Sequence, residues 1–397
     1  MRRLTNQTQP YVWGASAAIP DRLGLPATSE PVAESWMGAH PSASSRVTTG
    51  GGETRLDALI GADAEVLLGP DVVARFGKAL PYLMKIIAAE TPLSLQVHPD
   101  IEQARRGYAA EDAAGIPVDA PQRNYRDRNH KPELVYALTP FEALCGFRAP
   151  RRAAPLLTGR ASPLAKQLLR VLTAQLSYEG IRSAFTQLLE PGTRPTPAEV
   201  AELAEACAAR LAYGSPSPRA DRTVVLLAKA YPGDPGAVTS LLLNPVTLQP
   251  GEAMFVPAGG VHAYLHGMAV ETMASSDNVL RAGLTPKHVD VAELLRTVDY
   301  VAAPPIRIAP EVFHGATRVF YAPVDDFELS ITTVDDNLVH PLPGRGPRIL
   351  LCLDGELTID SGDANMTLGK GDSLFAPASD GGLTACGHGT LVQADVP

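Results

Sequence analysis

The sequence has no apolar run long enough to cross a bilayer and no closely spaced cysteines. Because a membrane-spanning helix needs about 18 or more apolar residues, none is expected in this chain of 397 residues. The first residues, MRRLTNQTQPYVWG, contain two arginines without a following apolar stretch, so no secretory signal peptide is expected. The four cysteines are scattered, which is typical of buried thiols in a reducing compartment and not of disulfides or thiolate metal sites. These absences predict a cytoplasmic protein.

An excess of positive charge is missing as well. The chain has 34 basic and 43 acidic residues and a net charge of -9, with no long basic run. This balance does not favour binding to nucleic acid or to a membrane surface, and an anionic ligand would need local positive groups. Hydrophobic residues make up 45% of the chain and charged residues 19%, as in globular proteins. The length predicts two or three domains with sizeable cores.

A short segment occurs twice in the second half of the chain. Residues 247–258 read TLQPGEAMFVPA and residues 367–378 read TLGKGDSLFAPA, and the two align without a gap. Each copy has the pattern of a strand, a turn and a strand, so the repeat predicts one type of β-barrel used twice. Just before the second copy, RILLCLDGELTI predicts a hairpin that turns at Asp354 and Gly355.

Residues 150–231 differ from the strand-rich remainder. Apolar residues there recur every three or four positions, and Thr196 and Glu199 have the spacing of a helix capping box. The sequence therefore predicts a mainly β fold with an all-α insertion. The expected domains are two parts of a first barrel at residues 1–149 and 232–300, the helical domain at residues 150–231, and a C-terminal barrel at residues 301–397.

Four polar residues are spaced as ligands of one metal ion. Gln96 and His98 share one face of an alternating strand, and Glu133 lies on a later strand. His262 follows a Pro-Gly turn that can aim its imidazole inward, whereas Gly382 stands at the matching position of the second copy of the repeat. Two imidazoles, a carboxylate and an amide oxygen suit a divalent ion, most simply Zn²⁺, and Mn²⁺, Fe²⁺ and Ni²⁺ also accept such ligands. A solvated strand face is the alternative interpretation of Gln96 and His98.

Two longer segments resemble the signatures of a known family. YRDRNHKPE at residues 125–133 and HAYLHGMAVETMASSDNVLRAGLTPK at residues 262–287 are similar to the two signatures of type I mannose-6-phosphate isomerases, zinc enzymes of the cupin superfamily. SLQVHPD and WMGAHP resemble further blocks of that family. The resemblance spans nearly the whole chain and implies two cupin (jelly-roll) β-barrels, the second degenerate, plus an all-α domain. It also implies a monomer that interconverts D-mannose 6-phosphate and D-fructose 6-phosphate and binds one zinc ion through Gln96, His98, Glu133 and His262.

The implied reaction gives a role to the charged residues near these motifs. Moving a carbonyl from C1 to C2 takes a proton from C2 and returns it to C1 through an enediolate. The resemblance implies that Arg281 is catalytic, and a permanently charged guanidinium suits the developing oxyanion. A base must carry the proton, and Lys131 and Glu271 are both candidates: a metal cation held by Glu133 would lower the pKa of Lys131, and desolvation would raise that of Glu271. An ion pair with Lys287 or Arg281 is the structural alternative for Glu271.

Other polar residues are expected to hold the sugar phosphate. Tyr264 and Asp277 are candidates for binding the sugar hydroxyl groups. The phosphate is expected near Ser94, Lys85 or an arginine of the helical insertion, because an anion on an acidic protein needs a local positive charge. The resemblance also implies that Ser94 and Lys287 lie near the substrate.

Two functions from other classes fit part of this pattern. A metal-dependent cupin oxygenase needs two histidines and one carboxylate with open coordination positions. Against it, Gln96 would be a fourth ligand, and Lys131 and Arg281 suit an anionic sugar. A non-catalytic bicupin that only binds a sugar phosphate has no need of these charged groups beside its metal. The expected partner is therefore a small sugar phosphate, without nucleic acid or membrane.

Overall fold

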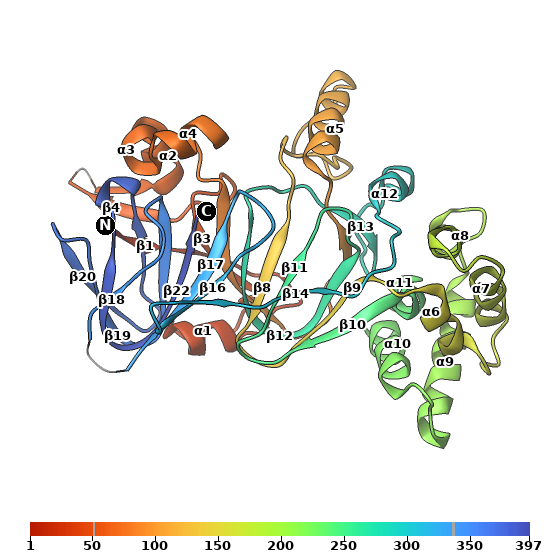
Figure 1. Cartoon of the computed structure of the whole chain (residues 1–397). Helices are drawn as coiled ribbons and strands as arrows, with labels where there is room; N and C mark the ends of the chain where they lie inside the picture. Colours follow the sequence, from red (N-terminus) through yellow and green to blue (C-terminus); the bar gives the residue numbers. More distant parts are fainter. Residues whose placement is uncertain (51, 336–337) are drawn as a thin grey trace.

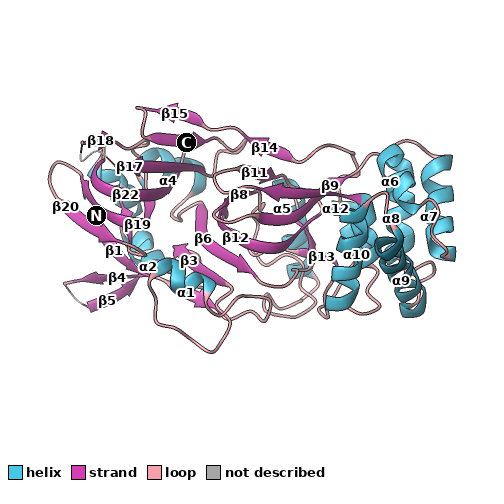
Figure 2. Cartoon of the chain, turned by 90° about the horizontal axis from the view of Figure 1, so that it is seen from below, coloured by secondary structure: helices cyan, strands magenta, loops and turns pink. Residues whose placement is uncertain are grey.

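Two β-sheets lie side by side in the chain, and a group of helices lies at one end (Figures 1 and 2). The structure is a computed structural model that describes residues 1–50, 52–335 and 338–397. The described strands form two sheets of 11 strands each. Among the described residues, no helix combines the length and the apolar character that a membrane span requires. The expectation of a mainly β chain with helices is confirmed.

The first sheet carries most of the predicted site residues. Its main path has the order β14-β11-β8-β12-β6-β3-β2, and β12 also pairs with β7 and β9, which in turn pair with β13 and β10. All pairings in this sheet are antiparallel, so adjacent strands can bring residues from distant segments to one face. The strands are β2 (Gln7–Gln9), β3 (Glu34–Gly38), β6 (Tyr82–Ala89), β7 (Leu95–Val97), β8 (Glu133–Ala137), β9 (Phe141–Phe147), β10 (Leu243–Leu248), β11 (Ala253–Val256), β12 (His262–Ala274), β13 (Leu280–Gly283) and β14 (Ile306–Ile308).

Strand β12 contains a bulge that decides which of its side chains face inward. Its ladder with β9 shifts between Tyr264 and His266, and the next residue, Gly267, has a φ of 112°. A Cβ at Gly267 would lie 2.5 Å from the carbonyl oxygen of Pro140, so the strand requires glycine at this position. Without the extra residue, Tyr264 and Glu271 would face opposite sides, because they are an odd number of positions apart. The bulge turns both toward one cavity.

The two ends of the chain meet in the second sheet, where Figure 1 shows both termini. Strands from the first 55 residues join it, with Arg2 opposite Phe375, a pairing that the sequence patterns did not predict. The path is β15-β16-β17-β22-β19-β21-β1-β4-β5, with β18 on β22 and β20 on β19. The strands are β1 (Arg2–Thr5), β4 (Arg46–Thr49), β5 (Gly52–Arg55), β15 (Glu311–Phe313), β16 (Thr317–Phe320), β17 (Glu328–Val334), β18 (His340–Pro341), β19 (Arg348–Asp360), β20 (Asn365–Gly369), β21 (Ser373–Ala376) and β22 (Thr384–Asp395).

The hairpin predicted at Asp354 and Gly355 is wrong. Strand β19 continues through both residues, and its pairing with β22 shifts register between Cys352 and Asp354. Gly355 has a φ of 76°, and its α-carbon approaches the backbone of His388 so closely that a Cβ would lie 2.0 Å from the carbonyl oxygen. The Asp-Gly pair therefore forms a bulge within a long strand, because pairing with β22 extends along both sides of it.

Both copies of the internal repeat form a strand, a turn and a strand. The first copy lies in β10 and β11, and the second lies in β20 and β21. The strand pairings of the described residues do not close into a ring in either sheet. The arrangement as two barrels, and the domain boundaries, stay predictions.

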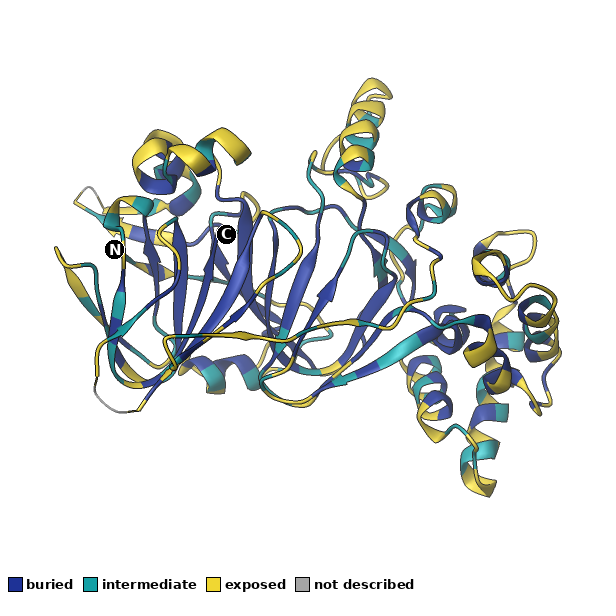
Figure 3. Ribbon diagram, viewed as in Figure 1, coloured by how far each residue is buried: buried dark blue, intermediate teal, exposed yellow. Residues whose placement is uncertain are grey.

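Helices fill the stretch that the apolar spacing marked as helical. In α9 the capping box is formed: the Thr196 backbone N–H donates to Glu199 Oε2 at 2.8 Å, and the Glu199 N–H donates to Thr196 Oγ1 at 3.3 Å. One buried apolar cluster joins these helices to the first sheet, and their outer faces are exposed (Figure 3). The consecutive helices are α6 (Pro150–Leu157), α7 (Pro163–Ala174), α8 (Tyr178–Leu189), α9 (Pro197–Tyr213), α10 (Pro218–Ala230) and α11 (Gly236–Thr239).

The remaining helices lie around the two sheets (Figure 1). Helices α2, α3 and α4 lie above the second sheet, and α5 projects beside them above the first (Figure 1). Between α4 and α5 the surface is hollowed by a cavity of about 900 Å³. The α-helices outside residues 150–239 are α1 (Ala18–Leu23), α2 (Leu56–Ala62), α3 (Ala64–Leu68), α4 (Pro70–Phe76), α5 (Ile101–Ala113) and α12 (Val291–Thr297).

Candidate metal centre and substrate cavity

Three buried side chains from separate strands converge at one point of the first sheet. Glu133 begins β8, His262 begins β12 and His98 directly follows β7. His98 Nε2 lies 3.2 Å from Glu133 Oε1, and His262 Nε2 lies 3.3 Å from Glu133 Oε2. One donor atom from each of the three residues lies within 4.8 Å of the others. The convergence predicted from the sequence for these three residues is present.

The hydrogen bonds around both imidazoles match those of metal ligands. Nδ1 of His98 lies 2.8 Å from the carbonyl oxygen of Asn278, and Nδ1 of His262 lies 3.0 Å from that of Gly260. Because a carbonyl only accepts, each Nδ1 carries a proton, which leaves Nε2 as the ring nitrogen available to a metal ion beside Glu133. Burial lowers the pKa of His98 to about 4, so its imidazole is neutral. Neutral imidazoles and a carboxylate are the protonation states that a divalent metal requires, and the donor set fits such an ion.

Gln96 lies beside this centre through its strand register. It is directly opposite His262 where β7 pairs with β12, and opposite Arg281 where β7 pairs with β13. Side chains of directly opposed residues project from the same face of a sheet. The Gln96 amide Nε2 donates to Ser94 Oγ at 3.3 Å, so its Oε1 points away from Ser94. The amide oxygen can therefore serve as a fourth ligand beside His262.

A cavity of about 980 Å³ opens in front of the three convergent residues. Its wall combines side chains from β3, β6, β7, β8, β12 and β13 with the loop at residues 121–126 and the segment at residues 230–234. His98 contacts Glu133 next to this cavity. The other eleven of the twelve predicted site residues line it: Lys85, Ser94, Gln96, Lys131, Glu133, His262, Tyr264, Glu271, Asp277, Arg281 and Lys287.

A row of buried charges crosses the floor of the cavity. Lys85 lies opposite Glu271 in the pairing of β6 with β12, and its Nζ is 2.7 Å from Glu271 Oε2 and 3.5 Å from Glu34 Oε1. Burial alone would lower the pKa of Lys85, but Glu271 and Glu34 raise it above its usual value, so the amine stays charged. The ion pair of Glu271 with Lys287 or Arg281, considered from the sequence, is wrong, because Lys85 takes that place.

Both candidate bases face the cavity. The pKa of Glu271 is raised, chiefly by burial and then by the nearby Glu133, although Lys85 opposes the shift. Both oxygens of Glu271 are engaged, since the Tyr264 hydroxyl donates to Oε1 at 2.7 Å and Lys85 holds Oε2. Lys131 is buried, and its Nζ lies 3.3 Å from Glu133 Oε1. The setting of Glu271 is thus polar, in contrast to the apolar one expected from its sequence neighbours.

Three cations line the cavity, and two of them are exposed at its mouth. Arg281, Arg126 and Lys287 all line it, with Arg281 half-buried and the other two exposed. Burial lowers the pKa values of Arg281 and Lys287. Repulsion from Arg126 lowers the pKa of Arg281 further, and repulsion from Arg281 and then from Arg126 lowers that of Lys287. Among the described residues, no arginine of residues 150–231 lines the cavity, so the expected contribution of the helical insertion is not found.

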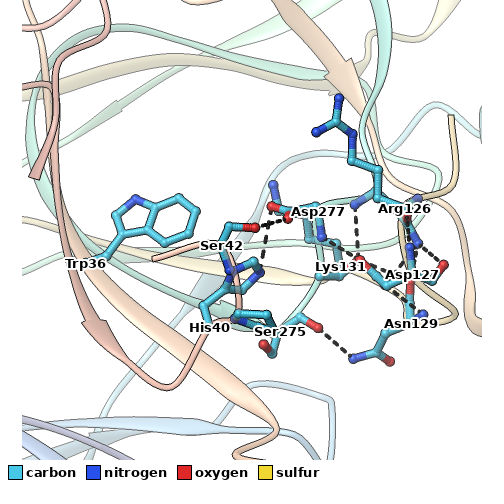
Figure 4. Close-up of polar contacts among 12 residues, drawn as sticks. Trp36, His40, Ser42, Arg126, Asp127, Asn129, Lys131, Ser275 and Asp277 are labelled. Carbon is cyan, nitrogen blue, oxygen red and sulfur yellow. Dashed lines mark hydrogen bonds and ion pairs between the residues drawn. The ribbon is translucent and has the colours of Figure 1, made fainter. Parts of the chain in front are cut away.

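Asp277 forms the wall between this cavity and the one beside α4. It lines both, as does Arg126. The Ser42 hydroxyl donates to Asp277 Oδ2 at 2.7 Å, and His40 Nε2 lies 3.7 Å from Oδ1 (Figure 4). These contacts fix the carboxylate at the edge of the cavity.

Comparisons with known proteins agree with this site. A family model described as phosphomannose isomerase type I, catalytic domain, matches residues 1–150, and one described as mannose-6-phosphate isomerase, cupin domain, matches residues 316–396. The mannose-6-phosphate isomerase of Escherichia coli (strain K12) is 41% identical over 398 residues, which cover 99% of both chains. The chain belongs to the type I phosphomannose isomerase family. The resemblance expected from the two signatures is therefore confirmed.

Members of this family from distant organisms are similar over almost their whole length. The mannose-6-phosphate isomerase of Homo sapiens is 31% identical over 408 residues, covering 95% of this chain and 93% of the human one. A crystal structure of a mutant phosphomannose isomerase from Salmonella typhimurium has a TM-score of 0.90 and 39% identity, covering 100% of this chain and 99% of that one. A zinc-bound crystal structure of mannose 6-phosphate isomerase has a TM-score of 0.89 and 39% identity with the same coverage.

Sequence reasoning missed several residues of the cavity wall of this family member, among them Glu34, Trp36 and Arg126. Glu34 and Trp36 lie on β3, and the Trp36 indole N–H donates to Glu34 Oε2 at 2.6 Å. An acidic residue at the start of the short segment ESWMG, two positions from a tryptophan, was the available signal for Glu34. Arg126 lies inside the first signature, where its charge could have marked it as a candidate for binding an anion.

Proposed function

We propose that this chain is a mannose-6-phosphate isomerase, an aldose-ketose isomerase that interconverts D-mannose 6-phosphate and D-fructose 6-phosphate. The observation that carries the proposal is one cavity that combines a buried His98, Glu133 and His262 centre with Arg281 on its wall. The relatives that match over the full length are named for this reaction. The alternatives, a cupin oxygenase and a non-catalytic sugar-phosphate-binding bicupin, are not favoured by these relatives.

The proposed cofactor is one zinc ion per chain, held by His98, Glu133 and His262 with Gln96 as fourth ligand. Support comes from the two imidazole Nε2 atoms that face one carboxylate and from the zinc-bound crystal structure of a relative. When bound, the ion would supply Lewis-acid stabilisation of negative charge on the sugar oxygens. The chain's own residues then have to bind the phosphate, orient C1 and C2, and move one proton.

The cations at the mouth suit the phosphate end of the substrate. Arg126 and Lys287 are exposed at the rim, and Ser94 lies on the wall beside Gln96. Arg281 lies further in, opposite Gln96 in the strand register. In this proposal the phosphate lies near Arg126, Lys287 and Ser94, and the carbonyl end of the sugar reaches Arg281. Asp277 and Tyr264 face the sugar hydroxyl groups between these two ends.

Lys131 is the first choice for the group that moves the proton between C2 and C1. Both oxygens of Glu271 are already engaged by Tyr264 and Lys85, whereas Lys131 has one ion pair, with Glu133, among the described residues. The guanidinium of Arg281 would stabilise the negative charge of the enediolate during the transfer. Exchange of the C2 proton with solvent in Lys131→Met and Glu271→Gln tests the choice. Loss of exchange in Glu271→Gln alone would reassign the base.

The fold is proposed in finer detail as two cupin barrels and an all-α domain, with the boundaries expected from the sequence. Support comes from the repeat and from the family model of a cupin domain at residues 316–396. The second barrel would lack the metal site, because Gly382 stands where the first copy has His262. We further propose a cytoplasmic monomer without nucleic-acid or membrane partners, and light scattering of the purified chain tests the monomeric state.

A coupled assay that converts fructose 6-phosphate onward tests the proposed reaction directly. The purified chain with zinc should turn over mannose 6-phosphate without oxygen or another co-substrate. Arg281→Ala should keep its zinc and lose about 10² to 10³ in rate, the usual effect of one lost electrostatic group. A near-normal rate in Arg281→Ala would remove its catalytic role, and no turnover by the wild-type chain would contradict the function itself.

A further inference from the structure

Asn278 is a fully buried residue that lies outside the predicted site. It belongs to the loop between β12 and β13, and its side chain forms every hydrogen bond that an amide can make. Its Nδ2 donates to the carbonyl oxygens of Asp127 and Asn129 at 2.9 Å and 2.8 Å. Its Oδ1 accepts from the backbone N–H groups of Arg126 and Asp127 at 2.7 Å and 3.2 Å. All of these partners lie in one loop, residues 126–129.

The tie between the two loops is reciprocal. Asp127 Oδ2 accepts from the backbone N–H of Asp277 at 2.7 Å, and Oδ1 accepts from the Ser276 hydroxyl at 2.9 Å. Figure 4 shows Asp127 and Asn129 facing Asp277 and Ser275, with the Arg126 side chain pointing away from this contact. The loop at residues 126–129 and the loop of Asn278 are therefore held against each other from both sides.

The backbone of Asn278 reaches the metal centre. Its carbonyl oxygen lies 2.8 Å from His98 Nδ1 and so fixes the tautomer of that imidazole. The loop that its side chain holds begins with Arg126 at the cavity mouth and leads within a few residues to Lys131 and Glu133. Asn278 thus connects His98 of the metal centre to the loop of Arg126, which leads to Lys131 and to Glu133 at the start of β8.

We propose that Asn278 is a positioning residue that sets the loop of Arg126 and Lys131 in place relative to His98. This inference rests on the proposed function for its role in the reaction. The side chain and the carbonyl act on different parts of the site, so a side-chain substitution can release the loop while the contact to His98 remains. Misplacement of reacting groups by about 1 Å can cost about 10²-fold in rate, which makes such a device necessary for catalysis.

The test is the variant Asn278→Asp, which keeps the size of the side chain and the backbone carbonyl. Its carboxylate can still accept from the N–H groups of Arg126 and Asp127, but it repels the carbonyl oxygens that Nδ2 had bound. We expect zinc to stay near one per chain, KM for mannose 6-phosphate to rise and kcat to fall, with a loss in kcat/KM of about 10²-fold. Binding of D-glucitol 6-phosphate, an acyclic hexitol phosphate without a carbonyl, should weaken about tenfold in calorimetry.

Asn244 provides a matched control. It is half-buried, lies outside the cavity wall, and its Nδ2 donates to the carbonyl oxygens of Phe147 and Ala303 at 3.0 Å and 2.9 Å. Asn244→Asp should lower the melting temperature but leave KM, kcat and hexitol phosphate binding unchanged. If Asn278→Asp does not fold, Asn278→Ser takes its place, because serine is too short to hold residues 126–129.

Two outcomes decide between positioning and mere stability. Wild-type KM, kcat and hexitol phosphate affinity in Asn278→Asp, with only a lower melting temperature, would overturn the proposal. Loss of zinc from Asn278→Asp would also overturn it, because the side chain would then support the metal ligands and not the loop. If the wild-type chain bound the hexitol phosphate without isomerising mannose 6-phosphate, the proposed function would fail, whereas weaker binding by Asn278→Asp would still support the positioning role.

Discussion

Removing the ammonium group of Lys85 tests the row of buried charges on the cavity floor. Lys85 Nζ lies 2.7 Å from Glu271 and 3.5 Å from Glu34, and all three side chains are buried. Lys85→Met keeps most of the apolar stem but leaves the two carboxylates without this cation. Removing one partner of a buried ion pair costs about 3 to 5 kcal/mol, because an uncompensated charge remains in the interior. We expect the free energy of unfolding to fall by about that amount at pH 8.

The loss of stability in Lys85→Met should be smaller at pH 5, because Glu271 can then bind a proton. Burial and Glu133 raise the pKa of Glu271 while Lys85 lowers it, so Lys85→Met should raise that pKa further. A carboxyl whose pKa is raised on folding contributes stability below its unfolded pKa, and this contribution is lost as the pH rises through the folded pKa. At pH 5 the folded variant can therefore bind a proton on Glu271, which removes part of the uncompensated charge.

Urea unfolding of the metal-free chains at pH 5 and pH 8 measures this difference, because zinc release at low pH then plays no part. Lys85→Met/Glu271→Gln should be more stable at pH 8 than Lys85→Met alone, since the second change removes the unpaired charge. Lys78→Met, at an exposed lysine, should change the free energy of unfolding by less than about 0.5 kcal/mol. Equal losses at both pH values, or additive effects of the two changes, would refute the reasoning.

Two other buried charge groups give further predictions. Asp395 and Glu328 are directly opposed on β22 and β17, and burial raises the pKa values of both. The contribution of this pair to the free energy of unfolding should be lost as the pH rises through the raised pKa values. Asp395→Asn should therefore reduce the fall in the urea midpoint between pH 5 and pH 9. An unchanged fall would contradict this prediction. Asp221→Ala would leave the buried guanidinium of Arg160 without its carboxylate and should cost about 3 to 5 kcal/mol. Hydrogen exchange should then accelerate in α9 and α10 but not in the sheets, and unchanged exchange in those helices would contradict the prediction.

The part of the site that could be predicted depends on local patterns. Gln96 and His98 are two positions apart on a strand, so their shared face follows from the period of a β-strand. The Pro-Gly turn before His262 and the residue types of the two signatures then pointed to one metal centre. Eleven of the predicted residues share one cavity wall. Seven of them lie on strands of a single sheet, and the other four, Ser94, Lys131, Asp277 and Lys287, lie in loops near the ends of those strands.

The remaining features depend on pairings between distant strands. Lys85 is the partner of Glu271 only because β6 and β12 align in one register, which the two sequences alone do not specify. The bulge at Gly267, which brings Tyr264 and Glu271 to the same side, depends on the close approach of Pro140. Local composition also cannot show that the N-terminal strands join the second sheet, since that pairing is set by long-range packing. The prediction of a hairpin turn at Asp354 and Gly355 was wrong for the same reason.

Removal and return of zinc test the central claim, that the centre of His98, Glu133 and His262 holds the ion on which the isomerase reaction depends. The chain is dialysed against a chelator, and the rate of fructose 6-phosphate formation from mannose 6-phosphate is measured as zinc is titrated back. We predict no turnover without metal and full recovery at one zinc per chain in the wild type, with no recovery at that ratio in Glu133→Gln. Undiminished turnover by the metal-free chain would contradict the account.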